Sequence, residues 1–235
     1  MKVSVIITSY NYGQYLKGAL DSALAQDYPD FEVLVVYRPS GDGTEKVLDG
    51  YQGKIKVVKQ EGAGLANAGN LGIKNSGGEY VIRLDADDLF YPDILGIEAR
   101  VLDAEPAVDF VYPDYTYYIK QTGERLRKYL PDFDRDELIS RGDFLSGGTM
   151  FRRSLFERVG YYDESLPTLE SYEFILRLMK RGIIGKHLPE NLFEYQIHDA
   201  SMSDNKELVA VTGRRIASAY GLEYQTGGSH PRRIP

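Results

Sequence analysis

Four short, mainly apolar segments alternate with longer amphipathic segments in the first part of the chain, and this alternation restricts the possible folds. The apolar segments are residues 3–7, 31–37, 55–58 and 80–84. Continuous apolar runs of this length are typical of strands covered on both faces, whereas apolar residues between them recur at helical spacing. Strands alternating with helices build βαβ units, so the sequence predicts an α/β fold with a mostly parallel central sheet flanked by helices.

The second half of the chain has a mixed pattern. Residues 115–119 and 125–129 flank a short polar turn, which predicts an antiparallel hairpin. Two further strands are expected, over residues 183–188 and 192–197. This mixture of hairpin, helices and short strands predicts a smaller, mixed half beside the parallel one.

The length of 235 residues suits one large domain or two small ones. Because no linker or repeat divides the chain, we expect one domain with two halves. The parallel half would comprise residues 1–112 and the mixed half residues 113–205. Residues 206–235 are expected to form a C-terminal helix and a loose polar tail.

Composition excludes several functional classes. The net charge of -7 argues against a general nucleic-acid-binding protein. The chain has no cysteine, which excludes disulfides and thiolate chemistry and fits a reducing compartment, so we expect a cytoplasmic location. No apolar run approaches the roughly 20 residues that cross a bilayer. Arginine pairs at 214–215 and 232–233 suggest at most a peripheral membrane contact.

Three carboxylates crowd the end of the strand predicted over residues 80–84, at Asp85, Asp87 and Asp88. Like charges this close repel one another, and a bound cation would relieve the repulsion. Hard oxygen ligands suit Mg²⁺ or Mn²⁺, and ligands of open α/β sheets bind beyond the carboxyl ends of the strands. This stretch alone is equally compatible with a cation site for a phosphorylated ligand and with an ordinary acidic turn.

A series of short motifs occurs over about residues 2–204. The motifs are Val3–Asn11, Tyr28–Val33, Gly69–Ile73, Gly78–Tyr80, Leu84–Asp88, Met150–Ser154, Gly160–Glu164, Glu170–Glu173 and Ile197–Ser201. Each motif is weak alone, but their order closely resembles that of family 2 glycosyltransferases. The resemblance implies a GT-A fold, a nucleotide-diphosphate sugar donor, Mn²⁺ or Mg²⁺, and inversion at the anomeric carbon. It also implies a glycan, lipid-linked or other cell-surface acceptor, as in polysaccharide biosynthesis. By the same resemblance, residues 1–112 would bind the nucleotide-sugar and residues 113–205 the acceptor.

The resemblance assigns roles to residues of the donor site. The first loop, from Thr8 through Ser9 to Tyr10, resembles the family's nucleotide edge, where the base packs on an aromatic ring. Tyr10 is the candidate ring, and an ordinary surface tyrosine is the alternative. Asp85 or the neighbouring Ala86 would reach the ribose.

The resemblance also assigns metal ligands. Asp87 or Asp88 would hold the metal, with Asp85 beside them, and Asp87 would also lie against the nucleotide. Asn70 is expected among the nucleotide-binding residues. His198 matches a histidine that can approach the diphosphate or the metal in similar enzymes, and a neutral imidazole is a competent ligand. A purely structural histidine is the alternative.

One departure from the family pattern concerns the base of the nucleotide. The second strand usually ends in Val-Asp-Asp-Gly-Ser, whereas here Arg38 replaces the second aspartate, which accepts a hydrogen bond from the ring N–H of uracil or thymine. Arginine only donates, so a uracil ring would lose its acceptor. We therefore expect the donor not to be recognised as an ordinary UDP-sugar. The alternative is that Arg38 points to solvent.

The other departures concern catalysis and the phosphates. The family's Glu-Asp-Tyr-Glu here has Ser171 in place of the aspartate that takes the acceptor proton, and serine accepts that proton poorly at neutral pH. Glu170 is the favoured replacement and Glu173 a less favoured one. Gly69 stands where relatives often carry an arginine that meets the donor phosphates.

These departures keep a second function open. A degenerate family member would bind a nucleotide or glycan without turnover. A third hypothesis, a phosphatase with an aspartate nucleophile at Asp85 or Asp87, lacks the threonine that usually follows.

Overall fold

The computed structural model describes residues 1–134, 136–137, 145, 147–198 and 206–222. The strands are β1 (Val3–Ser9), β2 (Phe31–Tyr37), β3 (Lys56–Lys59), β4 (Tyr80–Asp85), β5 (Leu89–Phe90), β6 (Phe110–Ile119), β7 (Glu124–Lys128), β8 (Met150–Arg152) and β9 (Gly185–Ile197). The helices are α1 (Gly13–Leu24), α2 (Thr44–Asp49), α3 (Leu65–Asn75), α4 (Ile94–Ala104), α6 (Ser154–Val159), α7 (Glu170–Lys180) and α8 (Lys206–Tyr220).

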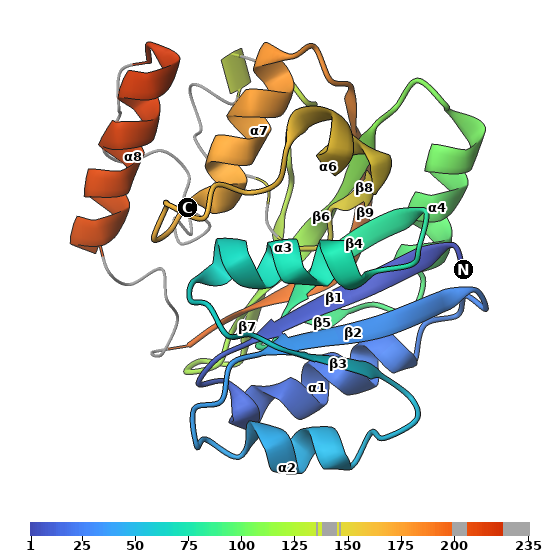
Figure 1. Ribbon diagram of the computed structural model, residues 1–235. Coiled ribbons are helices and arrows are strands. Elements are labelled where there is room, and N and C mark those ends of the chain that lie inside the picture. Colours follow the sequence, from blue (N-terminus) through green and yellow to red (C-terminus); the bar gives the residue numbers. More distant parts are fainter. Residues whose placement is uncertain (135, 138–144, 146, 199–205, 223–235) are drawn as a thin grey trace.

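The first four strands form the parallel part that the sequence predicts. β1 pairs in parallel with both β2 and β4, and β2 pairs in parallel with β3. Figure 1 shows α3 on one face of this part and α1 and α2 on the other, which explains why the consecutive residues Val5, Ile6 and Ile7, whose side chains point to alternate faces, are all buried. Because the strands run in one direction, their carboxyl ends meet at one edge of the sheet.

The mixed half continues the same sheet. Within the described residues the strand order is β3-β2-β1-β4-β8-β6-β9-β5, with β7 paired to β6. β8 is antiparallel to both β4 and β6, so it joins the two halves. The expected hairpin is confirmed as β6 and β7, which pair antiparallel from Tyr115 with Lys128 to Ile119 with Glu124.

One strand prediction was wrong. Residues of both segments, 183–188 and 192–197, belong to the single strand β9, which begins at Gly185 and pairs in parallel with β6 from Phe110 to Ile119. The pairing shifts between Pro113, which faces Leu188, and Asp114, which faces Asn191. The intervening residues of β9 form a bulge, and a bulge accommodates Pro189 without ending the strand.

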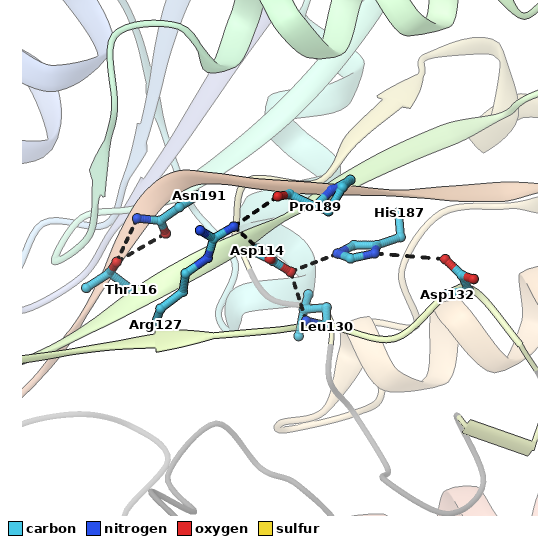
Figure 2. Close-up of polar contacts among 8 residues, drawn as sticks. All are labelled: Asp114, Thr116, Arg127, Leu130, Asp132, His187, Pro189 and Asn191. Atoms are coloured by element: carbon cyan, nitrogen blue, oxygen red, sulfur yellow. Dashed lines mark hydrogen bonds and ion pairs between the residues drawn. The ribbon is translucent and has the colours of Figure 1, made fainter.

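The buried carboxylate of Asp114 links β6, β7 and β9 through hydrogen bonds at this bulge (Figure 2). Asp114 on β6 is 1% exposed, and its Oδ1 accepts hydrogen bonds from His187 Nε2 at 2.8 Å and from the backbone N–H of Leu130 at 2.9 Å. Its Oδ2 accepts from Arg127 of β7 at 3.1 Å, and the same guanidinium donates to the carbonyl of Pro189 at 2.9 Å. The charge of Asp114 is therefore paired and hydrogen-bonded, which makes its burial tolerable.

A second buried carboxylate has no such partners. Glu98 on α4 is fully buried, and neither of its carboxylate oxygens has a hydrogen-bond partner within the part of the chain that the structure describes. Burial alone raises the pKa of Glu98 well above its ordinary value. The folded protein therefore holds this side chain in its neutral form over a wider pH range than the unfolded chain does.

This carboxylate should make stability depend on pH. Because the folded pKa of Glu98 is raised, its favourable contribution is complete below the ordinary value of 4.5 and is lost as the pH rises through the folded pKa. At about pH 8, Glu98→Leu should raise the free energy of unfolding by about 1–3 kcal/mol relative to the native chain. Urea unfolding at about pH 5 and about pH 8 would check this, and the gain should be smaller at the lower pH. Equal gains at both values would contradict it.

The C-terminal helix is also present, as α8, whereas the tail expected to be loose lies, from residue 223 on, outside the described residues. None of the helices described combines the length and apolar character needed to cross a membrane.

Candidate functional site

A cavity of about 370 Å³ opens at the carboxyl edge of the parallel strands. The ends of β1 and β4 and the residues that follow β2 and β3 line this cavity, as expected for ligand sites of open α/β sheets. The residues lining it include Thr8, Ser9, Tyr10, Tyr12, Arg38, Gln60, Arg83, Asp85, Ala86, Asp87, Asp88, Leu145, Gly147, Leu169, Glu170, Ser171 and Tyr195.

The predicted nucleotide edge lies on this cavity. Thr8 is buried and its hydroxyl donates to Asp85 Oδ1 at 3.3 Å, whereas Tyr10 is 45% exposed at the rim. The guanidinium of Arg38 lies 5.1 Å from the centre of the Tyr10 ring. Arg38 therefore reaches the cavity rather than pointing away from it, and its cation faces an aromatic ring.

Asn70 is the one predicted nucleotide-binding residue that the structure does not bring to the cavity. Its side chain is buried, and its Nδ2 donates to the Tyr162 carbonyl at 3.0 Å and to Glu164 Oε1 at 2.8 Å. Its Oδ1 accepts from the Tyr162 N–H at 3.0 Å. These bonds tie α3 to the segment after α6. Gly69 is part of the same contact, because a Cβ there would approach the Tyr162 ring to 3.2 Å.

The acidic strand end separates into two environments. Asp88 is 1% exposed, and its Oδ1 accepts from the backbone N–H of Gln196 at 2.8 Å, while its Oδ2 is enclosed without a partner among the described residues. Burial and the charges of Asp87 and Asp85 raise the pKa of Asp88 well above its usual range. Burial likewise raises the pKa of Asp85, although the neighbouring Arg83 opposes that rise.

Asp87 meets His198, although the two lie 111 positions apart in the sequence. Asp87 Oδ2 is 3.0 Å from His198 Nε2, and the imidazole is buried against the Tyr15 ring with 4.4 Å between ring centres. His198 follows β9, which pairs with β5 directly after the acidic turn. The structure therefore brings together two of the predicted metal ligands.

These residues suit a hard divalent cation that is shared with a phosphorylated ligand. Among the described residues no group of three or more histidines and carboxylates is arranged to hold a metal without other ligands. Mg²⁺ and similar ions commonly take only one or two carboxylates from the protein and complete their shell with water and substrate phosphates. Asp87 would supply one such carboxylate, and the His198 imidazole beside it could add a nitrogen ligand.

The predicted catalytic residues lie in different places. Glu170 is buried at the start of α7, and its Oε1 accepts from Arg83 at 3.0 Å, while Arg83 Nε is 3.3 Å from Asp85 Oδ1. Ser171 also lines the cavity. Glu173 lies elsewhere, since it forms a bidentate pair with Arg177 at 3.1 and 2.6 Å. Helical spacing alone did not distinguish the surroundings of the two glutamates.

The residue before Glu170 is strained. Leu169 has a φ of 61°, in the left-handed region that side chains other than glycine rarely adopt, and it lines the cavity. Strain of this kind costs about 1–3 kcal/mol and persists where the surrounding structure holds it in place. It sets the position at which α7 begins and at which Glu170 enters the cavity.

Gln60 is a polar cavity residue that the sequence analysis does not predict. It follows β3 directly, is 5% exposed, and lines the cavity beside Arg38. Ligands of open α/β sheets bind beyond the carboxyl ends of the strands, and this rule, which indicates Asp85, also applies to the residue that follows the third predicted strand. A predicted boundary at residue 58 placed Gln60 two positions outside that strand.

Comparison with known proteins assigns the fold and the family. The model of glycosyl transferase family 2 matches residues 4–160. An uncharacterized glycosyltransferase of Rickettsia typhi is 32% identical over 213 residues, which cover 86% of this chain and 66% of that protein. A similar protein of Rickettsia felis is 33% identical over 81% of this chain but only 33% of its own length. The chain thus spans between one third and two thirds of these relatives.

A third relative and two solved structures extend the likeness. The putative teichuronic acid biosynthesis glycosyltransferase TuaG of Bacillus subtilis is 29% identical over 87% of this chain and 82% of its own length. The structure of S. aureus TarS with UDP-GlcNAc has a TM-score of 0.76 and 24% identity, covering 93% of this chain and 66% of the other. The mannosyltransferase PcManGT of Pyrobaculum calidifontis, with GDP-Man and Mn²⁺, has a TM-score of 0.69 and 21% identity, covering 93% and 63%.

At these identities the solved structures establish the fold, a mixed α/β sheet of the GT-A type. The family model covers more than half of the chain, and the cavity lies at the carboxyl edge of the parallel strands, where open α/β sheets bind their ligands. The chain belongs to glycosyl transferase family 2.

Proposed function

We propose that this chain transfers a sugar, with inversion, from a nucleotide-diphosphate donor to a glycan, lipid-linked or other cell-surface acceptor. The observation that carries the proposal is the cavity, which places an aromatic ring, a basic fork and clustered carboxylates at the carboxyl ends of four parallel strands. Solved relatives of the same fold are complexes with UDP-GlcNAc and with GDP-Man, which supports a donor of this class.

The residues of the site have separate roles along the cavity. Tyr10 offers a ring for the base at the exposed rim, and Asp85, oriented by Thr8, offers a carboxylate to the ribose. Asp87 and His198 would hold Mn²⁺ or Mg²⁺, which supplies positive charge where the leaving diphosphate becomes more negative. Asp88 fixes the turn by accepting the backbone N–H of Gln196.

The acceptor side is assigned to the second half of the chain. Residues 1–112 contribute the nucleotide end of the cavity, and residues 113–205 contribute the end that carries Glu170 and Ser171. TuaG, named for teichuronic acid biosynthesis, supports an acceptor in polysaccharide assembly. We place the reaction in the cytoplasm, since the composition fits a reducing compartment.

Glu170 is our candidate for the group that accepts the proton of the attacking hydroxyl. It is the described carboxylate of α7 that enters the cavity, and the hydrogen bond from Arg83 holds it in place. Glu170→Gln should therefore lower turnover by about 10²–10⁴-fold while leaving nucleotide binding nearly unchanged.

Glu173→Gln is the matched control on the same helix, because this glutamate pairs with Arg177 outside the cavity. It should leave turnover within about a few-fold of the native chain, as expected for a change outside the reacting groups. Steady-state transfer rates and calorimetric nucleotide binding would be measured for both variants. Full activity of Glu170→Gln, or a selective loss in Glu173→Gln, would overturn the assignment.

A second function is favoured by one observation. Ser171 stands at the usual base position, and Glu170 is already paired with Arg83, so a protein that binds its donor without turnover would also fit. Incubating the chain with a panel of nucleotide-sugars and Mn²⁺, with and without simple sugar acceptors, separates the two. Release of nucleoside diphosphate from any donor supports the transferase, and binding without release supports the second function.

A further inference from the structure

Arg38 and Gln60 follow two neighbouring strands of the sheet, and both side chains line the proposed nucleotide end of the cavity. Arg38 follows β2 and Gln60 follows β3, and the parallel register sets Tyr37 opposite Lys59 at the ends of these strands. The backbone N–H of Gln60 donates to the Tyr37 carbonyl at 2.8 Å, which continues the pairing by one residue. Arg38, Gln60 and the Tyr10 ring all line the cavity.

The orientation of the Gln60 amide follows from its neighbours. Glu164 has only acceptors to offer, so Asn67 must turn its Nδ2 towards Glu164 Oε2, at 2.9 Å, and its Oδ1 towards Gln60. Gln60 Nε2 then donates to Asn67 Oδ1 at 3.0 Å and to the Gly64 carbonyl at 2.9 Å. Hydrogen bonds from Asn70 and Asn67 lower the pKa of Glu164, which keeps this carboxylate an acceptor.

The two side chains consequently offer opposite chemistry. Both amide hydrogens of Gln60 are engaged, so its Oε1 is left as an acceptor and receives no hydrogen bond from the described residues. The guanidinium of Arg38 is a fork of donors, and it forms no ion pair or hydrogen bond within the described residues. A ligand between them would meet adjacent donors on one side and one acceptor on the other.

We propose that Arg38 and Gln60 together form hydrogen bonds with the base of the donor, and that this base is cytosine or guanine. This proposal rests on the proposed function. An arginine fork binds best to two neighbouring acceptors. Cytosine has them at O2 and N3, beside its amino group, and guanine has them at N7 and O6, beside its N1–H. In uracil the two carbonyls are separated by the ring N–H, and in adenine the amino group separates N7 from N1.

Binding of nucleotides to the whole chain tests the choice of base. Dissociation constants of CDP, GDP, UDP and ADP would be measured by calorimetry with Mn²⁺. CDP or GDP should bind at least about tenfold more tightly than UDP and ADP, which is the effect expected from one satisfied polar pair. UDP or ADP binding as tightly as the best of the others would overturn the proposal. Failure of all four to bind would overturn the proposed function itself.

Variants test the role of Gln60 separately. Gln60→Ala should weaken the preferred nucleotide by about 5- to 100-fold and leave UDP nearly unchanged, so the preference disappears. An equal loss for all four nucleotides would show a structural role and overturn the reading of the base, as would an unchanged preference. Gln52→Ala is the matched control, because that glutamine is exposed and bonds only Asp49, at 3.3 Å; it should behave like the native chain.

Discussion

Asp87→Asn should lower the rate of sugar transfer by at least about 100-fold, because it removes the charge that would hold a cation against the diphosphate. In the native chain, His198 Nε2 lies 3.0 Å from Asp87 Oδ2. Asparagine has nearly the same shape as aspartate and can still accept a hydrogen bond from this nitrogen. The loss would therefore report charge rather than packing. Transfer rates across a range of Mn²⁺ concentrations would measure it, together with the dissociation constant of the nucleoside diphosphate with and without Mn²⁺.

Asp93→Asn provides the control. Asp93 is an exposed aspartate at the start of α4, only six positions away in the sequence, and its side chain makes no capping hydrogen bond. This variant should keep the native rate and the native response to Mn²⁺. If Asp87→Asn also keeps them, the acidic turn is not the cation site and the proposed division of roles along the cavity is wrong.

Asp114→Ala should reduce the free energy of unfolding by about 3–5 kcal/mol, without any direct effect on the cavity. The change leaves Arg127, His187 and the backbone N–H of Leu130 without the carboxylate that all three now contact. Removing one member of a buried network leaves the others partly desolvated and unpaired, and that penalty exceeds the value of any single bond. Urea unfolding followed by circular dichroism would measure the difference.

The same histidine supplies the control for this experiment. Asp132 approaches the other ring nitrogen, His187 Nδ1, at 3.9 Å (Figure 2). Its side chain, however, is 96% exposed. An exposed pair of this kind contributes about 0–1 kcal/mol, so Asp132→Ala should change stability very little. If both variants lost a comparable free energy of unfolding, the burial of Asp114 would not explain its effect on stability.

Much of the fold follows from the sequence because its cause is local. Continuous apolar runs and helical spacing report burial directly, so the four parallel strands, the hairpin and the helix over residues 65–75 could be predicted. β9 could not, because a proline normally argues against a strand interior, and only pairing with β6 shows that Pro189 lies in a bulge.

The candidate site divides in the same way. The rule on strand ends locates the carboxylates Asp85 and Asp87, and it would locate Gln60 had the third strand been extended by one residue. The partners of these groups come from distant segments that no spacing reveals. Arg83 meets Glu170 only because α7 begins beside β4, and Asn70 faces Tyr162 instead of the cavity because α3 packs on the segment after α6.

The contact between Asp87 and His198 has a consequence for biosynthesis. The acidic turn leaves the ribosome more than a hundred residues before the histidine that faces it, and β8, which separates β4 from β6 in the sheet, is made between the two. The parallel half therefore emerges with an open sheet edge at β4 and with one of the two residues of the proposed cation site. The contact between Asp87 and His198 can form only when the whole sheet closes, so the two halves are expected to fold as one cooperative unit.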